Sequence, residues 1–446
     1  MDNAYGDEER QKMKCIVNKS KLDGFLTAPA SKSHTIRAIL LATMADGVST
    51  IRNPLLSNDC RSAISASRQF GAGITENPVE HSLRIEGRGG KLLVPDDVVD
   101  CGNSGTTTIF VMAMGALLDD GYAVFTGDEQ IRRRPVHWLV DNLNALGAKA
   151  FLTRPGMQAP PVVVGGRIKG GTAHFDGFNS QVVSATMMAA AICGAPVEIH
   201  VEAPKEKPYL QMTIDWMKRF SVELAANSSD YRYFSLRGDA TYRALDVQVP
   251  GDWSAVAFPL LAACITPSEI SIHGVDFHDA QGDKVIIDYA EQMGAKITRD
   301  EATGTLLIHG GSPLHSGLCI DLTDTPDALP ALAVMAACAE GETRFTGLAH
   351  VRVKETDRVA VMEEELRKLG AHVSSTRDSM CIQGAYPLHG ANVHSHGDHR
   401  VAMALAVAGL VCDGPTTVED ALCAAVSYPS FYEEFRRLGA DFTLLE

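Results

Sequence analysis

The sequence repeats itself six times along its length. Six Ala-rich apolar runs each end in a short turn, and the turn residues lie 73 or 74 positions apart, at Gly47, Gly121, Gly194, Pro267, Gly341 and Gly414. An apolar-alternating run such as VSTIRN or YAVFTG follows each turn and indicates a strand. The period is too long for the usual solenoid repeats and predicts a few units packed around one core.

A second marker recurs in the same register. It is a large apolar residue followed by Gly-Ala, at Phe70-Gly71-Ala72, Leu146-Gly147-Ala148, Met293-Gly294-Ala295, Leu369-Gly370-Ala371 and Leu438-Gly439-Ala440, with a degenerate third copy at Phe220-Ser221-Val222. Amphipathic patterns such as VMEEELRKLGA precede it, and Gly is the expected residue just beyond a helix end. Each repeat is therefore predicted to contain a buried helix, a strand, an amphipathic helix and further strands.

The chain ends suggest how the repeats group. The sixth repeat stops at Glu446 without the strand pair that closes the others, and the segment Cys15–Thr27 has strand character. We expect that segment to complete the sixth repeat. Six repeats divide most simply into two lobes of three, one made of residues 1–31 plus 251–446 and the other of residues 32–250.

Composition narrows the class of protein. Of the 446 residues, 45% are hydrophobic and 21% charged, which is typical of a globular protein, and the net charge of −15 argues against a nucleic-acid partner. No stretch has the roughly 20 uninterrupted apolar residues of a membrane span, and the polar start Met1 to Lys14 lacks the core of a signal peptide. Ten cysteines without a CxxC pair fit a reducing compartment. We expect a cytoplasmic protein.

The predicted buried helices begin with unusual first turns. They read SKSHTIR, GNSGTTT, FNSQVVS, GDWSAVA, DTPDALP and GDHRVAM. Ser, Asn and Asp are ordinary N-caps, but Lys32, Arg37, His399 and Arg400 oppose the positive end of the helix dipole. Cations at several such ends make sense when an anion lies among them.

Two further charged runs admit more than one interpretation. In RRRP, Arg132 and Arg133 are best explained as a solvated face. In RVKETDR, the mixed charges fit either simple pairing along a helix or a functional site. His394, His396 and His399 do not have a common metal-ligand spacing, so we expect no metal. The sequence also lacks a P-loop, a G-x-S-x-G elbow and an H-E-x-x-H motif.

Six segments together resemble a known family. PASKSHTIRAILLA, GNSGT, RRRP, SQ, VKETDR and GDHRVAMA are similar to the signature segments of 5-enolpyruvylshikimate-3-phosphate (EPSP) synthases, and the resemblance runs from about residue 14 to the end. It implies a mixed α/β fold of two lobes, each of three βαβαββ units with buried helices, and an active site between them. It also implies transfer of the enolpyruvyl group of phosphoenolpyruvate to the 5-hydroxyl of shikimate 3-phosphate, within aromatic amino acid biosynthesis. No metal, cofactor or covalent enzyme intermediate is expected, and the protein is expected to be a monomer.

The resemblance also assigns roles to residues. Asp327 would take the acceptor proton, Glu355 would handle the methylene proton, and Lys32 and Lys354 would assist. The residues that resemble the phosphoenolpyruvate site are Lys32, Gly105, Arg134, Gln181, Arg358 and Arg400. Those that resemble the acceptor site are Lys32, Ser33, Arg37, Asn179, Ser180, Gln181, Tyr209, Asp327, His350 and Lys354. Asn103 and His399 would support the site.

Several positions depart from the family pattern. Ile109 and Val426 replace cations, His350 replaces an Asn, and Asn179 and Glu206 replace two serines that hold the acceptor's phosphate. The alternatives are a transferase for another acceptor, such as a UDP-N-acetylglucosamine enolpyruvyl transferase, a catalytically silent anion-binding protein, or a metal-dependent phosphoryl transferase. The loop before the Arg-Pro lacks the Cys of the first alternative, and joint retention of Lys32, Asp327 and Glu355 weighs against the second. For the third, the sequence offers no identifiable carboxylate metal site.

Overall fold

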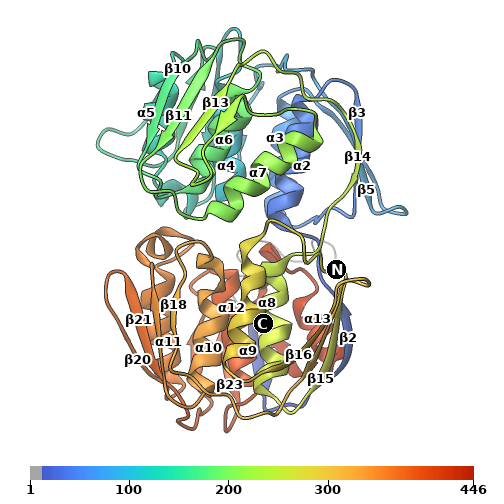
Figure 1. Ribbon diagram of the computed structural model, residues 1–446, viewed down its shortest axis with the longest axis vertical. Helices are drawn as coiled ribbons and strands as arrows, with labels where there is room; N and C mark the ends of the chain where they lie inside the picture. The colour runs from blue at the N-terminus through green and yellow to red at the C-terminus, as the bar shows by residue number, and fades with distance from the viewer. Residues whose placement is uncertain (1–12) are drawn as a thin grey trace. The chain divides into compact units, whose positions relative to one another are not determined.

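The computed structural model describes residues 13–446, which form two compact lobes. The C-terminal lobe contains residues 13–29 and 251–446, and the N-terminal lobe contains residues 30–250. The sequence from Met1 to Lys14, which we expect not to be a signal peptide, lies mostly outside the described residues. Each lobe contains three four-stranded sheets and the helices that pack on them (Figure 1).

The N-terminal lobe is built from the first three repeats. Its sheets have the spatial orders β14 (Asp246–Gln248), β3 (Val48–Arg52), β5 (Ser82–Glu86), β4 (Gly73–Asn77); β6 (Val99–Asp100), β7 (Tyr122–Thr126), β9 (Val162–Gly165), β8 (Lys149–Leu152); and β10 (Gly171–Phe175), β11 (Val197–Val201), β13 (Tyr233–Leu236), β12 (Ala226–Asn227). In each sheet the first two strands are parallel and the other pairs are antiparallel. In the second and third sheets a helix crosses over between the parallel strands, α4 (Gly105–Gly115) between β6 and β7 and α6 (Ser180–Ala190) between β10 and β11. The parallel strands β14 and β3 of the first sheet lie far apart in the chain.

The C-terminal lobe repeats the same pattern. Its sheets have the orders β2 (Asp23–Thr27), β15 (Glu269–His273), β17 (Thr305–His309), β16 (Lys296–Asp300); β18 (Cys319–Asp321), β19 (Glu342–Thr346), β21 (Ser379–Gln383), β20 (His372–Ser375); and β22 (Asn392–His394), β23 (Thr416–Glu419), β1 (Lys14–Asn18), β24 (Asp441–Leu445). The prediction of a mixed α/β fold of six βαβαββ repeats is confirmed.

One helix of each repeat is buried on all sides. These helices are α2 (Lys32–Met44), α4 (Gly105–Gly115), α6 (Ser180–Ala190), α8 (Trp253–Ile265), α10 (Leu329–Cys338) and α12 (His399–Gly409). Every residue of α12 is buried, as expected of a helix that is apolar all round. In the C-terminal lobe α8, α10 and α12 contact one another and lie between the sheets (Figure 1).

The second helix of each repeat is amphipathic. These helices are α3 (Asn58–Gln69), α5 (His137–Ala145), α7 (Lys207–Arg219), α9 (Ile286–Gln292), α11 (Arg358–Lys368) and α13 (Phe431–Arg437). Each ends in the predicted marker. Gly370 after α11 has the left-handed φ of +94°, and Ser221, in the degenerate copy after α7, adopts φ +66° at the cost of some strain. Among the described residues, no helix is both long enough and apolar enough to cross a bilayer.

Side chains cap most of the buried helices at their N-termini. Ser31, Ser104, Asn179, Asp252 and Asp398 each accept a backbone N–H from the first turn of the helix that follows. The exception is α10, which is preceded by the 3₁₀ turn η3 (Pro326–Ala328) and has no side-chain cap bond. The caps hold the first turns of these helices rigid.

The N-terminal segment is divided between two repeats, which corrects the expectation that all of it completes the sixth. Strand β1 does so, because it pairs with β23 and β24. Strand β2 instead pairs in parallel with β15 and opens the fourth repeat. In the same way β14, from the end of the third repeat, pairs with β3 and opens the first. The chain passes from one lobe to the other twice, once just after β2 and once just after β14. Each of these strands opens a repeat whose remaining strands lie elsewhere in the sequence.

Candidate active site

A buried guanidinium organises the charged residues of the C-terminal lobe. The Arg358 side chain, at the start of α11, has no solvent exposure, and it donates to three carboxylates. Its Nε lies 2.6 Å from Asp398 Oδ2, its Nη1 2.7 Å from Asp327 Oδ1, and its Nη2 2.5 Å from Glu355 Oε2. Burial by itself would lower the pKa of Arg358, but Asp398, Glu355 and Asp327 raise it well above its usual value. The guanidinium is therefore a fixed positive charge.

Asp327 lies between two guanidinium groups. Its second oxygen, Oδ2, is 2.8 Å from Nη2 of Arg400, a residue in the first turn of α12 that is only 5% exposed. Burial would raise the pKa of Asp327, but Arg400, Arg358 and Lys354 outweigh burial and Glu355 and hold this pKa well below its usual range. Asp327 is thus ionised at neutral pH and a weak proton acceptor in this arrangement.

The charged run RVKETDR divides into a pair that caps a helix and residues that join the charge cluster around Arg358. Arg352 binds both oxygens of Asp357 at 2.8 Å, and Asp357 Oδ1 caps α11 by accepting the Ala360 N–H at 3.0 Å. These two residues stabilise the helix start. Glu355 lies between these two residues and Arg358 follows them, and both belong to the charge cluster around the Arg358 guanidinium.

Asp398 is a central residue of this cluster that sequence reasoning did not assign. Its side chain is fully buried, binds Arg358, and caps α12 by accepting the Arg400 N–H at 2.9 Å. The signal was present, since Asp398 opens the GDHR helix start, but an Asp there is also an ordinary cap. His399 is buried beside it, and His350 is buried in the 3₁₀ turn η4 (Ala349–Val353).

In the N-terminal lobe a second buried guanidinium, Arg37, is held by oxygens of its own helix α2 and of the neighbouring helix α7. It donates to the Thr213 hydroxyl at 2.8 Å, to the Ser33 carbonyl at 3.0 Å and to the Tyr209 carbonyl at 3.4 Å. Burial lowers the pKa of Arg37 to about 10, with Tyr209 and Glu206 acting in the opposite direction. Arg37 therefore stays charged at neutral pH. Thr213 was not predicted, and nothing in its spacing singles it out.

Glu206 occupies the hydrogen-bond donors at the start of α6. Its Oε2 accepts the Ser180 hydroxyl at 2.6 Å and the Ser180 backbone N–H at 3.2 Å. Glu206 is only 3% exposed and has a left-handed φ of +53°. Asn179 caps the same helix by accepting the Gln181 N–H at 2.8 Å. The chain's own carboxylate thus lies at the positive end of this helix dipole.

Lys32 is also paired inside the N-terminal lobe. Its Nζ lies 3.0 Å from Oδ2 of Asp59, and the two side chains are 11% and 6% exposed. Asp59 was not predicted, because an acidic residue in the first turn of α3 is explained by the helix dipole alone. The pairing orients the Lys32 side chain at the start of α2.

The last predicted residues of this lobe surround Gly105. A Cβ atom built on Gly105 would collide with Nη1 of Arg134, so the glycine lets the guanidinium lie against the start of α4. Gln181 donates to the hydroxyl of Thr106 at 3.0 Å. Asn103 donates to Asp128 at 2.5 Å, in the loop before the 3₁₀ turn η1 (Ile131–Arg133). Gly105, Arg134 and Gln181, three of the residues expected to bind phosphoenolpyruvate, therefore lie near the start of α4.

The charge cluster predicts a pH-dependent stability. Because the pKa of folded Asp327 lies below its ordinary value of 3.8, its stabilising effect is full above that pH and is lost as pH falls through the folded value. Asp327→Asn should lower the free energy of unfolding at pH 7 by about 1–3 kcal/mol, because hydrogen bonds to charged groups are lost. The difference from wild type should shrink below about pH 4. Urea unfolding between pH 7 and pH 3 measures it, with the exposed Asp239→Asn as control. A difference that is constant with pH would contradict the assignment.

Comparisons with known proteins agree with this geometry. Residues 16–435 match the family model "EPSP synthase (3-phosphoshikimate 1-carboxyvinyltransferase)". The chain is 40% identical to a 3-phosphoshikimate 1-carboxyvinyltransferase of Acetivibrio thermocellus over 96% of this chain and 99% of that protein. It is 39% identical to the Methanocella arvoryzae protein of the same name, over 95% and 98% of the two chains.

Solved structures support the same conclusion. An EPSP synthase from Acinetobacter baumannii superposes with a TM-score of 0.81 at 27% identity, covering 98% of this chain and all of that one. The enolpyruvyl transferase NikO from Streptomyces tendae, at 17% identity and a TM-score of 0.78 over 97% and 99% of the two chains, shares the fold. The resemblance drawn from the sequence is confirmed: the chain belongs to the EPSP synthase (3-phosphoshikimate 1-carboxyvinyltransferase) family of transferases.

Proposed function

We propose that this protein transfers the enolpyruvyl group of phosphoenolpyruvate to the 5-hydroxyl of shikimate 3-phosphate and releases phosphate. The observation that carries the proposal is the cluster of the half-buried Asp327 and Glu355 with the buried Arg358 and Arg400, which combines two acid–base groups with two cations. In the first step the acceptor oxygen adds to C2 of phosphoenolpyruvate, the hydroxyl proton goes to a base, and C3 gains a proton. In the second step C3 loses a proton and the C2–O bond to phosphate breaks.

Asp327 is the proposed base, although its carboxylate is held by two guanidinium groups. Arg358 and Arg400 are also the proposed ligands of phosphoenolpyruvate, whose carboxylate and phosphate would compete with Asp327 for their donors. Substrate binding would therefore weaken the contacts that depress the pKa of Asp327 and add negative charge beside it. Both effects raise the affinity of Asp327 for a proton when the acceptor is present. Proton transfer by a placed side chain contributes about 10²–10⁴-fold to the rate.

Glu355 and the two lysines complete the proposed chemistry. Glu355 is oriented by Arg358 Nη2 at 2.5 Å and would exchange the proton of the methylene carbon. Lys354 precedes it in the chain and lowers the pKa of Asp327, so its charge is already felt in the cluster. Lys32, fixed by Asp59, would stabilise the charge that develops on the reacting oxygens.

Arg134 and its neighbours supply the remaining substrate contacts in this proposal. Arg134, against Gly105, would bind the phosphate of phosphoenolpyruvate, with Gln181 beside it. The acceptor would be held by Ser33, Arg37, Asn179, Ser180, Gln181, Tyr209 and His350. Arg37 and the Ser180 hydroxyl are donors suited to an anionic acceptor.

We also infer that the reaction takes place in the cytoplasm, because none of the ten cysteines forms a disulfide. A monomeric state and the lack of a nucleic-acid partner stay predictions.

The test of the proposed function is phosphate release from phosphoenolpyruvate with chelator present throughout. Shikimate 3-phosphate, unphosphorylated shikimate and UDP-N-acetylglucosamine are compared as acceptors. Turnover is expected with shikimate 3-phosphate and should fall at least about 100-fold in Glu355→Gln, which keeps the shape but not the acid. Turnover only with another acceptor would reject the assigned acceptor, and no turnover with any of them would reject the reaction.

A second prediction concerns Gly105. In Gly105→Ala the new Cβ must displace the Arg134 guanidinium, so KM for phosphoenolpyruvate should rise about tenfold, equivalent to about 1.4 kcal/mol. KM for the acceptor should change much less. Gly73→Ala is the matched control, because its Cβ would meet Glu86 at an ordinary 3.4 Å. An unchanged KM for phosphoenolpyruvate would place the Arg134 guanidinium outside its site.

A third prediction concerns Glu206. If Ser180 binds the acceptor's phosphate, that phosphate must displace or approach the buried Glu206 carboxylate, and like charges about 4 Å apart repel by about 4 kcal/mol near a protein surface. Glu206→Gln keeps the length of the side chain and removes the charge. It should lower KM for shikimate 3-phosphate about tenfold and leave KM for phosphoenolpyruvate unchanged. The exposed Glu202→Gln is the control. A raised KM would show that the carboxylate assists the acceptor.

A further inference from the structure

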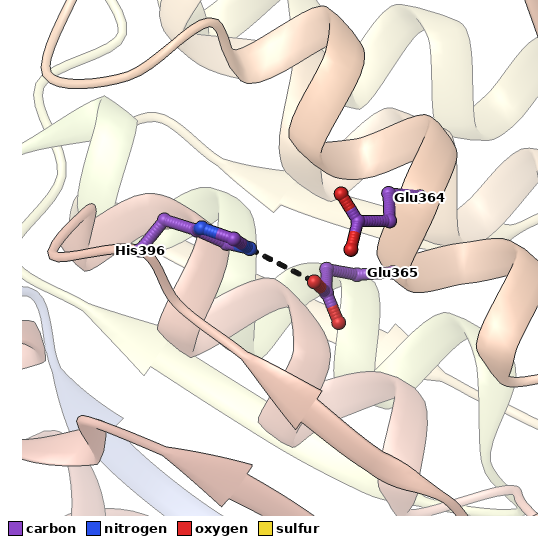
Figure 2. Close-up of side chains that lie close together, drawn as sticks. All are labelled: Glu364, Glu365 and His396. Atoms are coloured by element: carbon purple, nitrogen blue, oxygen red, sulfur yellow. Dashed lines mark hydrogen bonds and ion pairs between the residues drawn. The ribbon is translucent and has the colours of Figure 1, made fainter.

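A cluster of two carboxylates and an imidazole lies beside the charged site of the C-terminal lobe. Among the described residues, Glu364, Glu365 and His396 form the one group of three whose potential metal-ligand atoms all lie within 4.8 Å of one another. Both glutamates belong to α11, and His396 belongs to the loop between β22 and α12 (Figure 2). His399, which the sequence placed with His394 and His396 as metal candidates, is not part of this group.

A lysine already supplies the positive charge of this cluster. Lys368 Nζ lies 2.8 Å from Glu365 Oε1 and 3.1 Å from Glu364 Oε1. Its hydrogen bond is the largest cause of the lowered pKa of Glu364. The cluster is therefore an ion-pair network, and the question is what its buried member, Glu365, holds in place.

Glu365 binds the loop before α12 at two points. Its side chain is fully buried, its Oε2 accepts the His394 backbone N–H at 3.0 Å, and its Oε1 lies 2.9 Å from His396 Nε2 (Figure 2). The His396 N–H in turn donates to His394 Nδ1 at 2.7 Å. His396 has a left-handed φ of +55°, a conformation that a non-glycine residue keeps only when its surroundings impose it.

The other end of the same loop is held by the same helix. Arg358 lies seven residues before Glu365, hence two turns earlier on the same face of α11. Its Nε binds Asp398, which caps α12 and accepts the Arg400 N–H. Helix α11 thus fixes the loop 394–398 at both ends, through Glu365 at His394 and through Arg358 at Asp398. Arg400 lies two residues after Asp398.

We propose that Glu365 is a positioning residue for the transfer reaction: through His394 and His396 it fixes the loop that carries Asp398, His399 and Arg400, and so sets the affinity for phosphoenolpyruvate. This inference rests on the proposed function, because it needs Arg400 as a ligand of that substrate. Glu365 itself touches no substrate. Its charge holds backbone and imidazole donors that the Arg358–Asp398 pair cannot reach.

Glu365→Gln and Glu364→Gln form a matched pair of variants. Each removes one carboxylate from the Lys368 network, but only Glu365 bonds to the loop. Glu365→Gln should raise KM for phosphoenolpyruvate about 3- to 30-fold, the usual range for a mutation that acts through its neighbours. KM for shikimate 3-phosphate should change less than about twofold, and Glu364→Gln should resemble wild type in both. Equal KM values for phosphoenolpyruvate in the two variants would overturn the proposal.

Hydrogen–deuterium exchange gives a readout that does not depend on turnover. Glu365→Gln should speed exchange in a peptide covering residues 394–400 and leave α8 unchanged, whereas Glu364→Gln should do neither. His396→Leu should reproduce the loop and KM effects, and His396→Gln, which keeps a donor, should restore them in part. A wild-type protein without turnover would reject the proposed function, and the exchange comparison would still decide whether Glu365 holds the loop. Unchanged exchange in Glu365→Gln would reject that role.

Discussion

The buried guanidinium of Arg358 constrains most of the C-terminal lobe's chemistry. A charge without exposure costs several kcal/mol unless its partners are in place, so Asp327, Glu355 and Asp398 must converge on it. Those partners come from the η3 turn, from the residues just before α11 and from the cap of α12. The same packing of α10, α11 and α12 that forms the core therefore also places these charges. Such a cluster is preorganised before any ligand arrives, which is the condition for strong electrostatic catalysis.

The repeats could be predicted from the sequence because the residues that mark them recur at a nearly constant spacing. Turns 73 or 74 residues apart and helices ending in Gly-Ala are local signals, and the six βαβαββ repeats follow from them. The exchange of opening strands was not predictable in this way. Cys15 pairs with Val418, and Asp246 pairs with Thr50. The residues around each of these positions contain no sequence signal that identifies its distant partner. Strand character alone therefore led us to assign β1 and β2 to the same repeat, whereas the two strands belong to different sheets.

Sequence analysis singled out those residues of the candidate site whose charge is unfavourable at a helix start. Lys32, Arg37 and Arg400 stood out because cations oppose the helix dipole there. Their partners did not, since Asp59 and Asp398 occupy positions where an acid is already favourable. Thr213 lies 176 residues from Arg37, and only the packing of α7 against α2 brings them together. A residue that satisfies a local rule conceals its second role, as Asp398 does by capping α12 and binding Arg358.

In both lobes the chain's own carboxylates occupy donors suited to an external anion. Asp327 holds Arg358 and Arg400, Asp59 holds Lys32, and Glu206 holds Ser180. Ligand binding would then exchange one anion for another, so the affinity is the difference between two similar interactions and not the full strength of either. In the proposed reaction such an exchange would have a catalytic use at Asp327, because loss of its cations to the substrate would make the carboxylate a stronger base. At Glu206 the proposed reaction has no proton transfer, and the same exchange would only weaken binding of a phosphorylated acceptor. On this proposal the two carboxylates differ in effect: Asp327 would take part in the transfer reaction, and Glu206 would influence which acceptor the protein binds.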